Sequence, residues 1–339
     1  MSRFHNTLFV TQKRSTLRSE GETLALMRDG QPKVQVPMHH LQAVVCFGYV
    51  VVTPAAMHAC AKAGVSVVFL SAGSGRFLAR IEGPQTRTAT LRRSQYAACD
   101  NVERGLQLAR GFVLGKLLNA RVLTQRAART RRQHRDALNR LSDRMKTLGS
   151  QAMQAAGLDA LRGVEGEAAG RYFAHFDMML DRAHFPFEKR SRRPPTNPVN
   201  ALLSLGYALL ANDCIAALEA AGLDPAVGFL HVERSGRPSL ALDLMEEFRS
   251  VFVDRLVLAL LRRNQFKLDD FITEPSGAVR LTDDKRREFI KAYQEQKADT
   301  VVHPGAAKPV AWAVVPHMQA TLLARAVRGE SDYIPFVHR

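Results

Sequence analysis

The chain has 339 residues, of which 46% are apolar, and its formal net charge at pH 7 is +16. This length allows two domains with ordinary cores, and the charge predicts a polyanionic partner, either nucleic acid or an anionic membrane. No signal peptide opens the sequence and no apolar stretch approaches about eighteen residues, so a cytoplasmic nucleic-acid-binding protein is the simpler expectation.

The first eighty or so residues contain short segments that alternate or cluster apolar residues as strands do. The turn residues at 29–32 and 73–75 separate some of these segments, and Thr53 followed by Pro54 predicts the start of one short helix. The expected strands lie at 6–10, 23–27, 33–37, 43–48, 65–70 and 76–81. We therefore expect a small β-rich domain over residues 1–83.

After Gly83 and Pro84 the apolar residues recur with the period of a helix. The clearest series are Leu106, Ala109, Val113, Leu117 and Ala120, and then Leu138, Leu141, Met145 and Leu148. The fold class expected is α+β, with the small N-terminal β-rich domain followed by a mainly α-helical catalytic domain over 84–339. A continuous sheet through 104–146 would contradict this expectation.

Positive charge is concentrated in this helical span. Between residues 87 and 150 the sequence has fifteen Lys or Arg against four Asp or Glu, an excess of eleven. A solvated surface usually mixes both signs, so we interpret the excess as a phosphate-binding surface, with an ordinary solvated face as the alternative. Its densest part comprises Arg126, Arg129, Arg131, Arg132 and Arg135.

Farther on, Glu165 stands between Gly163 and Gly166, and small residues follow it. Such residues would let this helix approach another backbone closely and hold Glu165 inside a packed interface. The alternative is an ordinary acidic residue near a helix N-terminus.

A basic, proline-rich loop over 189–200 then enters an apolar helix, and its Arg192 and Arg193 are expected to bind DNA together with the arginine run. Asn197 or Asn200 is the expected N-cap of this helix. The apolar stretch is too short and too interrupted to cross a membrane, which predicts a core helix.

The stretch over 228–249 brings together residues that could hold a metal ion. His231 ends a short apolar run, a polar loop follows, and a helix with Ser239 as its N-cap carries Asp243 and Glu246 on one face. Oxygen ligands with one imidazole suit Mg²⁺ or Mn²⁺ better than zinc. The alternative is a hydrogen-bonded histidine beside a solvated acidic face that includes Glu247.

Three motifs in this order resemble a known family. They are EG with AA and YF after it, RRPPTNPVNALLSLGYALL, and GFLHVERSGRPSLALDLMEEFR. Together they resemble Cas1, the CRISPR-associated endonuclease and integrase that inserts new spacers. GRFLARIEGP and LRRSQY are similar to the family's β-rich domain and the start of its helical domain, so the resemblance covers nearly the whole chain. The LALDLMEEFR version is most similar to type I-C members.

The resemblance implies roles for individual residues. Glu165, His231 and Glu246 match the family's metal ligands, and Asp243 matches a neighbouring acid that some relatives need at the site. Glu247, like Glu167, matches no ligand position. On a helix Glu247 points about 100° away from Glu246, so Glu247→Ala is expected to reduce activity much less than His231→Ala or Glu165→Ala. The resemblance also implies Mg²⁺ or Mn²⁺, a homodimer formed through the β-rich domain, and assembly with a Cas2 dimer.

The expected function is therefore a metal-dependent DNA endonuclease and integrase of CRISPR adaptation. Its substrates would be prespacer fragments and the CRISPR repeat, joined by 3′-hydroxyl attack on a phosphodiester, and it would also cleave single-stranded or branched DNA. The arginines would supply affinity for the DNA backbone without reading sequence. A non-catalytic DNA-binding scaffold is the alternative.

Overall fold

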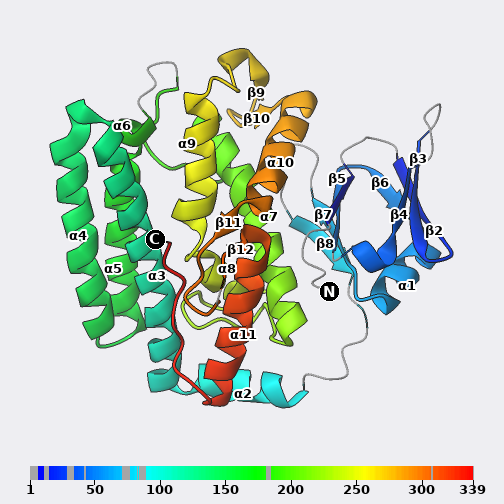
Figure 1. Cartoon of the computed structure of the whole chain (residues 1–339), viewed down its shortest axis with the longest axis horizontal. Coiled ribbons are helices and arrows are strands. Elements are labelled where there is room, and N and C mark those ends of the chain that lie inside the picture. Colours follow the sequence, from blue (N-terminus) through cyan, green and yellow to red (C-terminus); the bar gives the residue numbers. More distant parts are fainter. Residues whose placement is uncertain are drawn as a thin grey trace. The chain divides into compact units, whose positions relative to one another are not determined.

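The computed structural model describes residues 7–10, 15–28, 34–41, 43–70, 77–81, 83, 89–180, 185–306 and 308–338. The chain divides into two compact units, Met1–Arg87 and Thr88–Arg339 (Figure 1). The first is rich in strands and the second is mostly helical, so the expected α+β class is confirmed. The turns expected at 29–32 and 73–75 lie outside the described residues.

Two four-stranded sheets build the β-rich unit, in the orders β4-β3-β2-β6 and β1-β5-β7-β8. Sequence periodicity found six of these strands but not β2 or β6. The strands are β1 (Thr7–Val10), β2 (Ser15–Glu20), β3 (Thr23–Met27), β4 (Val34–Pro37), β5 (Ala43–Phe47), β6 (Val50–Val52), β7 (Ser66–Leu70) and β8 (Phe77–Ile81). Helix α1 (Pro54–Lys62) begins as expected, since the Thr53 hydroxyl accepts a hydrogen bond from the Ala56 N–H at 3.3 Å.

The second unit is built from ten α-helices among its described residues, together with two short two-stranded ribbons. The helices are α2 (Ala89–Asp100), α3 (Val102–Thr130), α4 (Arg135–Gln154), α5 (Leu158–Ala174), α6 (Phe176–Leu180), α7 (Pro198–Ala221), α8 (Ser239–Met245), α9 (Arg255–Arg262), α10 (Asp283–Ala298) and α11 (Val315–Arg328). The ribbons pair β9 (Phe271–Thr273) with β10 (Val279–Leu281), and β11 (Thr300–Val301) with β12 (Val310–Ala311).

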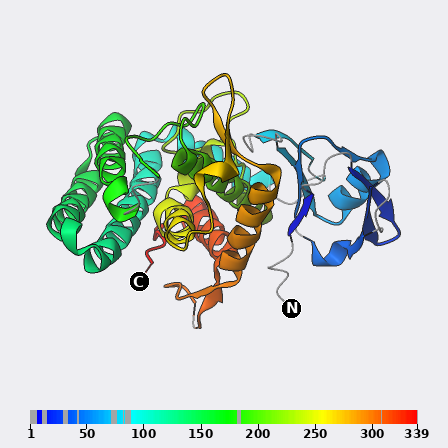
Figure 2. The same ribbon diagram turned by 90° about the horizontal axis from the view of Figure 1, so that it is seen from above.

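Helices α3, α4 and α5 lie side by side in both views (Figures 1 and 2). They pack through the apolar series read from the sequence, because Leu106, Ala109, Val113, Leu117 and Ala120 of α3 are all buried. Leu138, Leu141, Met145 and Leu148 of α4 are buried as well. Helical periodicity thus located this bundle correctly.

Helix α7 is longer than the sequence suggested. It spans 24 residues, and its side-chain cap is Asn197, which accepts a hydrogen bond from the Asn200 N–H at 2.8 Å. By length and composition α7 could cross a membrane, so the expectation that it was too short was wrong. Its most apolar window is 72% buried inside the unit, however, which fits the predicted core helix.

The segment after α11 runs back along α3 (Figure 1). The side-chain amide of Asn119, fully buried in α3, donates hydrogen bonds to the carbonyls of Glu247 and Phe336 at 2.7 and 2.8 Å. Its oxygen accepts one from the His338 N–H at 2.8 Å. A single buried amide therefore joins α3, the turn after α8 and the C-terminal segment.

Candidate active site

His231 is held by the carboxylate of Asp243. His231 Nδ1 lies 2.7 Å from Asp243 Oδ1, and the backbone N–H groups of Phe229, Leu230 and His231 donate to the same carboxylate at 2.7–3.0 Å. An acceptor at Nδ1 places the hydrogen there and leaves the Nε2 lone pair free, as in a metal-ligating histidine. Asp243 itself is fully buried and uses all its acceptor positions, so it positions His231 rather than contacting an ion.

Gly228 makes this arrangement possible. A Cβ atom on Gly228 would come within 2.8 Å of Asp243 Oδ2 and of the Ser239 carbonyl carbon. Only glycine fits this close approach. Ser239 starts α8 but is not its side-chain cap, contrary to expectation; its hydroxyl instead donates to the Val232 carbonyl at 3.2 Å.

The acidic residues beside α8 are not a solvated face. Asp243, Glu246 and Glu247 are all buried, and Glu246 and Glu247 lie in a turn between α8 and a π-helical segment, Arg249–Asp254. Buried carboxylates need partners, and π-helical turns occur often at functional sites. The alternative of a solvent-exposed acidic surface is therefore wrong for these three residues.

Glu165 and Glu246 converge on one cation, the ammonium of Lys116. Lys116 Nζ lies 2.7 Å from Glu246 Oε2 and is also hydrogen-bonded to Glu165 Oε1. His231 Nε2 lies 4.0 Å from the other oxygen of Glu246, Oε1. The three predicted ligands are thus brought to one place by α5, the loop before α8 and the turn after α8.

Positive charge around Glu246 keeps its carboxyl ionised. Burial would raise the pKa of Glu246, but mainly the positive charges of Arg249 and Lys116 lower it to about 2. Arg249 Nε lies 3.1 Å from Glu246 Oε1, an ion pair without the alignment of a hydrogen bond. A permanently ionised carboxylate is the form that a cation requires.

The donor set fits a hard divalent cation. Two carboxylates and a free imidazole nitrogen are the ligands expected for Mg²⁺ or Mn²⁺. Among the described residues, however, no group of three or more His, Cys, Asp or Glu side chains is already arranged to hold a metal ion. Lys116 stands between the carboxylates, and a metal site would form only when its ammonium moves aside.

The surroundings of Glu165 differ from the close helix packing that Gly163 and Gly166 suggested. It lies in the middle of α5, not near its N-terminus, and a Cβ on Gly163 or Gly166 would meet no atom within 4 Å. These glycines therefore serve no close packing. The contact with the histidine loop comes instead from Arg162, whose Nε donates to the Leu230 carbonyl at 2.9 Å.

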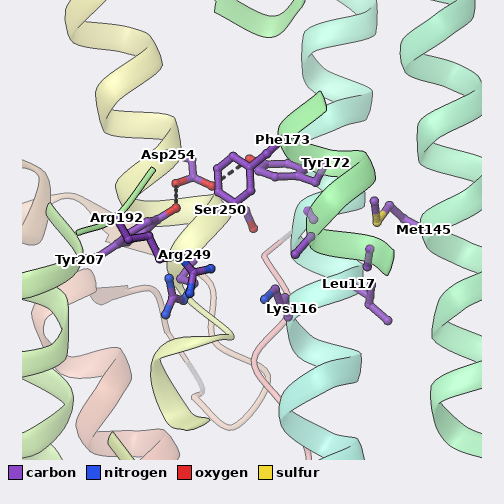
Figure 3. Close-up of a pocket in the computed structure, with 13 residues that line it drawn as sticks. Lys116, Leu117, Met145, Tyr172, Phe173, Arg192, Tyr207, Arg249, Ser250 and Asp254 are labelled. Atoms are coloured by element: carbon purple, nitrogen blue, oxygen red, sulfur yellow. Dashed lines mark hydrogen bonds between the residues drawn. The ribbon is translucent and has the colours of Figure 1, made fainter. Parts of the chain in front are cut away.

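Beside Lys116 lies a pocket with a basic edge and an aromatic wall (Figure 3). Lys116, Arg192 and Arg249 line it together with Tyr207 and Asp254. Its other lining residues are Leu117, Ala120, Met145, Ala168, Ala169, Tyr172, Phe173 and Ser250. Arg192, predicted from the proline-rich loop, is therefore near the candidate site, and Arg193 is exposed next to it.

Asp254 fixes the aromatic wall of this pocket (Figure 3). Its carboxylate accepts hydrogen bonds from the hydroxyls of Tyr172, at 2.9 Å, and Tyr207. Burial raises the pKa of Asp254 to about 6, although Tyr207, Tyr172, Arg249 and Arg190 oppose the shift. The guanidinium of Arg249 lies 4.6 Å from the centre of the Tyr207 ring, a cation–π contact that links the pocket to Glu246.

The predicted arginine run lies at the junction of α3 and α4. Arg129, Arg132 and Arg135 are exposed, whereas Arg126 and Arg131 are half-buried. Basic residues of α9 are close by, since Arg126 and Arg131 lower the pKa values of Arg255 and Arg262, respectively, in addition to burial. The run is thus part of a larger basic surface that extends to α9, and sequence analysis did not predict this extension.

Sequence analysis missed Lys116, Arg249 and Asp254. A signal existed for Lys116, because between Arg110 and Arg121 it is the only charged residue in an otherwise mostly apolar part of α3. A lone charge in an apolar helical stretch indicates a buried partner. Asp254 gave a weaker signal, since it follows the apolar residues Val251, Phe252 and Val253 but stands directly before Arg255.

Comparison with known proteins gives matches over most or all of the chain. The family model for the CRISPR associated protein Cas1 matches residues 8–295. A CRISPR-associated endonuclease Cas1 of Chlorobaculum tepidum is 45% identical over 345 residues, covering 100% of both chains.

Two solved structures share the fold. A casposase bound to an integration product has a TM-score of 0.81 and 22% identity, and the match covers 97% of this chain and 92% of that chain. A Cas6-RT-Cas1–Cas2 complex has a TM-score of 0.85 and 24% identity, covering 99% of this chain and 36% of that chain. The family model and the 45% identical relative show that the chain belongs to the Cas1 family of CRISPR-associated proteins.

Proposed function

We propose that this protein is a divalent-metal-dependent DNA endonuclease and integrase of CRISPR adaptation, of the type I-C kind. One observation carries the proposal: Glu165 and Glu246 share a single cation beside His231, whose Nδ1 is bound to Asp243. This is a ligand set for Mg²⁺ or Mn²⁺ assembled from three separate elements. The relative from Chlorobaculum tepidum is named an endonuclease, which supports the same activity here.

Each side chain of the site has a task in this reaction. Glu165, Glu246 and His231 Nε2 would hold the ion, and Asp243 keeps His231 in the tautomer that it needs. When bound, the ion would neutralise charge on the scissile phosphate and activate water or a DNA 3′-hydroxyl as the nucleophile. Arg192 and Arg249, which line the adjoining pocket, would bind phosphate oxygens. No covalent enzyme nucleophile is required.

The proposed partners are DNA, a second copy of this chain and a Cas2 dimer. Prespacer fragments and the CRISPR repeat would bind the basic surface through their backbones. The β-rich unit would form the homodimer, and its exposed apolar residues Tyr49 and Val51 support a protein contact there. A solved complex of the same fold contains Cas2, and the casposase of the same fold is bound to an integration product.

A cleavage and strand-transfer assay tests the proposal. Branched DNA and a supercoiled plasmid bearing a repeat are incubated with the protein and Mn²⁺, with EDTA in a parallel reaction. We expect cleavage and joined product only with the ion, and equal DNA binding in both reactions, because the arginines supply affinity. Binding without any metal-dependent chemistry would support the alternative, a DNA-binding scaffold.

The arginine run gives a separate prediction about affinity. Replacing Arg129, Arg132 and Arg135 by glutamine should weaken DNA binding alike across sequences, because these exposed side chains would contact phosphates. The slope of log affinity against log salt should become shallower by up to about 0.9 per lost contact on duplex DNA. Fluorescence anisotropy over a salt series measures both quantities.

A matched control is available on α10. Arg287 is also exposed, but it pairs with Asp284 at 2.9 Å on a face that mixes both signs. Arg287→Gln should leave the affinity and the salt slope unchanged. Unchanged values in the triple variant would mean that the run is only a solvated face.

A further inference from the structure

We propose that Lys116 is a resident competitor of the divalent ion, an ammonium that holds Glu165 and Glu246 together until the ion displaces it. The inference rests on the metal site of the proposed function and adds a residue to it. Lys116 forms ion pairs with both carboxylates at once, so one cation from the chain itself occupies the place between two of the proposed ligands.

Lys116 is held in this position by its neighbours on α3. A Cβ on Gly115 would lie 2.8 Å from Glu247 Cγ and 2.9 Å from Pro335 Cβ, so glycine lets the helix backbone come close to the turn that carries Glu246. One turn later, Asn119 donates to the Glu247 carbonyl at 2.7 Å. The helix is thus docked on both sides of Lys116, which fixes where its ammonium can reach.

Electrostatic repulsion explains why a cation is needed between Glu165 and Glu246 when the metal ion is absent. The exposed fractions of the side chains are 15% for Lys116, 26% for Glu165 and 4% for Glu246. Two carboxylates at such low exposure repel each other strongly unless a positive charge lies between them. Arg249 lies beside one oxygen of Glu246, but Lys116 is the cation that contacts both carboxylates, and it stabilises the folded chain when the ion is absent.

The ion pairs of Lys116 with Glu165 and Glu246 also oppose binding of the metal ion. To bind Glu165 and Glu246, the ion must break both ion pairs and then remain near a displaced positive charge. Lys116 has room to leave, because it also lines the adjoining pocket (Figure 3). Ser250 lines that pocket too, and its buried hydroxyl has no hydrogen-bond partner among the described residues, so it offers an acceptor.

The test compares Mn²⁺ binding by the whole protein and its Lys116→Met variant, measured by isothermal titration calorimetry without DNA. The variant should bind Mn²⁺ about tenfold more tightly, equivalent to about 1.4 kcal/mol, because no ion pair must be broken and carboxylate repulsion is relieved. Its melting temperature without the ion should fall, and the rise on adding Mn²⁺ should exceed that of the unaltered protein. Lys116→Arg, which keeps the charge, should not bind the ion more tightly.

Lys146→Met is the matched control, since Lys146 is an exposed lysine in the middle of α4. It should change neither affinity nor melting temperature. If Lys116→Met folds too poorly, Lys116→Gln replaces it, and a variant that folds only with Mn²⁺ supports the inference. Mn²⁺ affinity that is equal or weaker in the uncharged variants overturns the inference while the metal site stands. Absence of Mn²⁺ binding in every protein overturns the inference and the proposed function together.

Discussion

His231→Ala is expected to lower metal-dependent cleavage and strand transfer by about 100-fold or more. Loss of an outer partner of a metal ligand alone costs about 10–100-fold, and here the ligand itself is removed. His231→Ala removes the imidazole nitrogen that faces Glu246, and Asp243 in α8 cannot replace it because its carboxylate already uses all its acceptor positions. Rates on branched DNA in Mn²⁺ measure the loss.

A DNA-binding measurement on this variant should distinguish loss of catalysis from loss of affinity for DNA. His231→Ala should bind DNA as tightly as the unaltered protein, because the basic surface of α3 and α4 lies on other elements. His175→Ala is the matched control; its Nδ1 is hydrogen-bonded to the Arg171 carbonyl at the end of α5, away from the carboxylates. Full activity in His231→Ala, or an unfolded variant by circular dichroism, would remove the support for the metal site.

Glu247→Ala is expected to reduce the free energy of unfolding by about 3–5 kcal/mol. Glu247 is fully buried and accepts hydrogen bonds from the Phe336 N–H at 2.7 Å, from the Gln319 amide at 2.9 Å and from the Tyr333 hydroxyl. Each donor left unpaired costs about 1–3 kcal/mol, and the truncation leaves a cavity as well. Urea unfolding followed by circular dichroism gives the value.

The mild effect of Glu247→Ala expected from sequence concerned catalysis and stays a prediction, whereas the loss expected here is one of stability. Glu247 does point away from the carboxylate pair, as helix geometry predicted, but it points into the core and not toward solvent. The control is Glu295→Ala on α10, where the side chain is 66% exposed and the change should stay within about 0.5 kcal/mol. Equal stability of the Glu247 and Glu295 variants would contradict the structural role.

The sequence predicted elements where periodicity is strong and failed where tertiary contacts decide. The α3 and α4 stripes and the start of α1 were found because apolar spacing and capping are local. Strand β2, with the sequence STLRSE, has too few apolar residues to indicate a strand, and its pairing with β3 and β6 establishes it. The full length of α7 was missed because its second half contains polar residues within the buried helix.

Part of the candidate site was also predictable, because some of its residues lie close together in the sequence. His231, Asp243 and Glu246 lie within sixteen residues of one another, so local reading could group them. The joining of Glu165 depended on family motifs, since nothing local links α5 to that loop. Lys116 and its pairing with both carboxylates arise from a contact between distant helices, which no local pattern encodes.

The docking of the C-terminal segment also affects when the site can form during synthesis of the chain. Residues 333–338 contribute partners to Asn119 and Glu247, both next to the carboxylate pair, and they are translated more than 200 positions after α3. The β-rich unit has its core residues, 10–67, available from an early stage. A chain still attached to the ribosome therefore displays its arginine-rich helices well before the nuclease centre can be completed, so the emerging protein can meet nucleic acid before it is able to cut it.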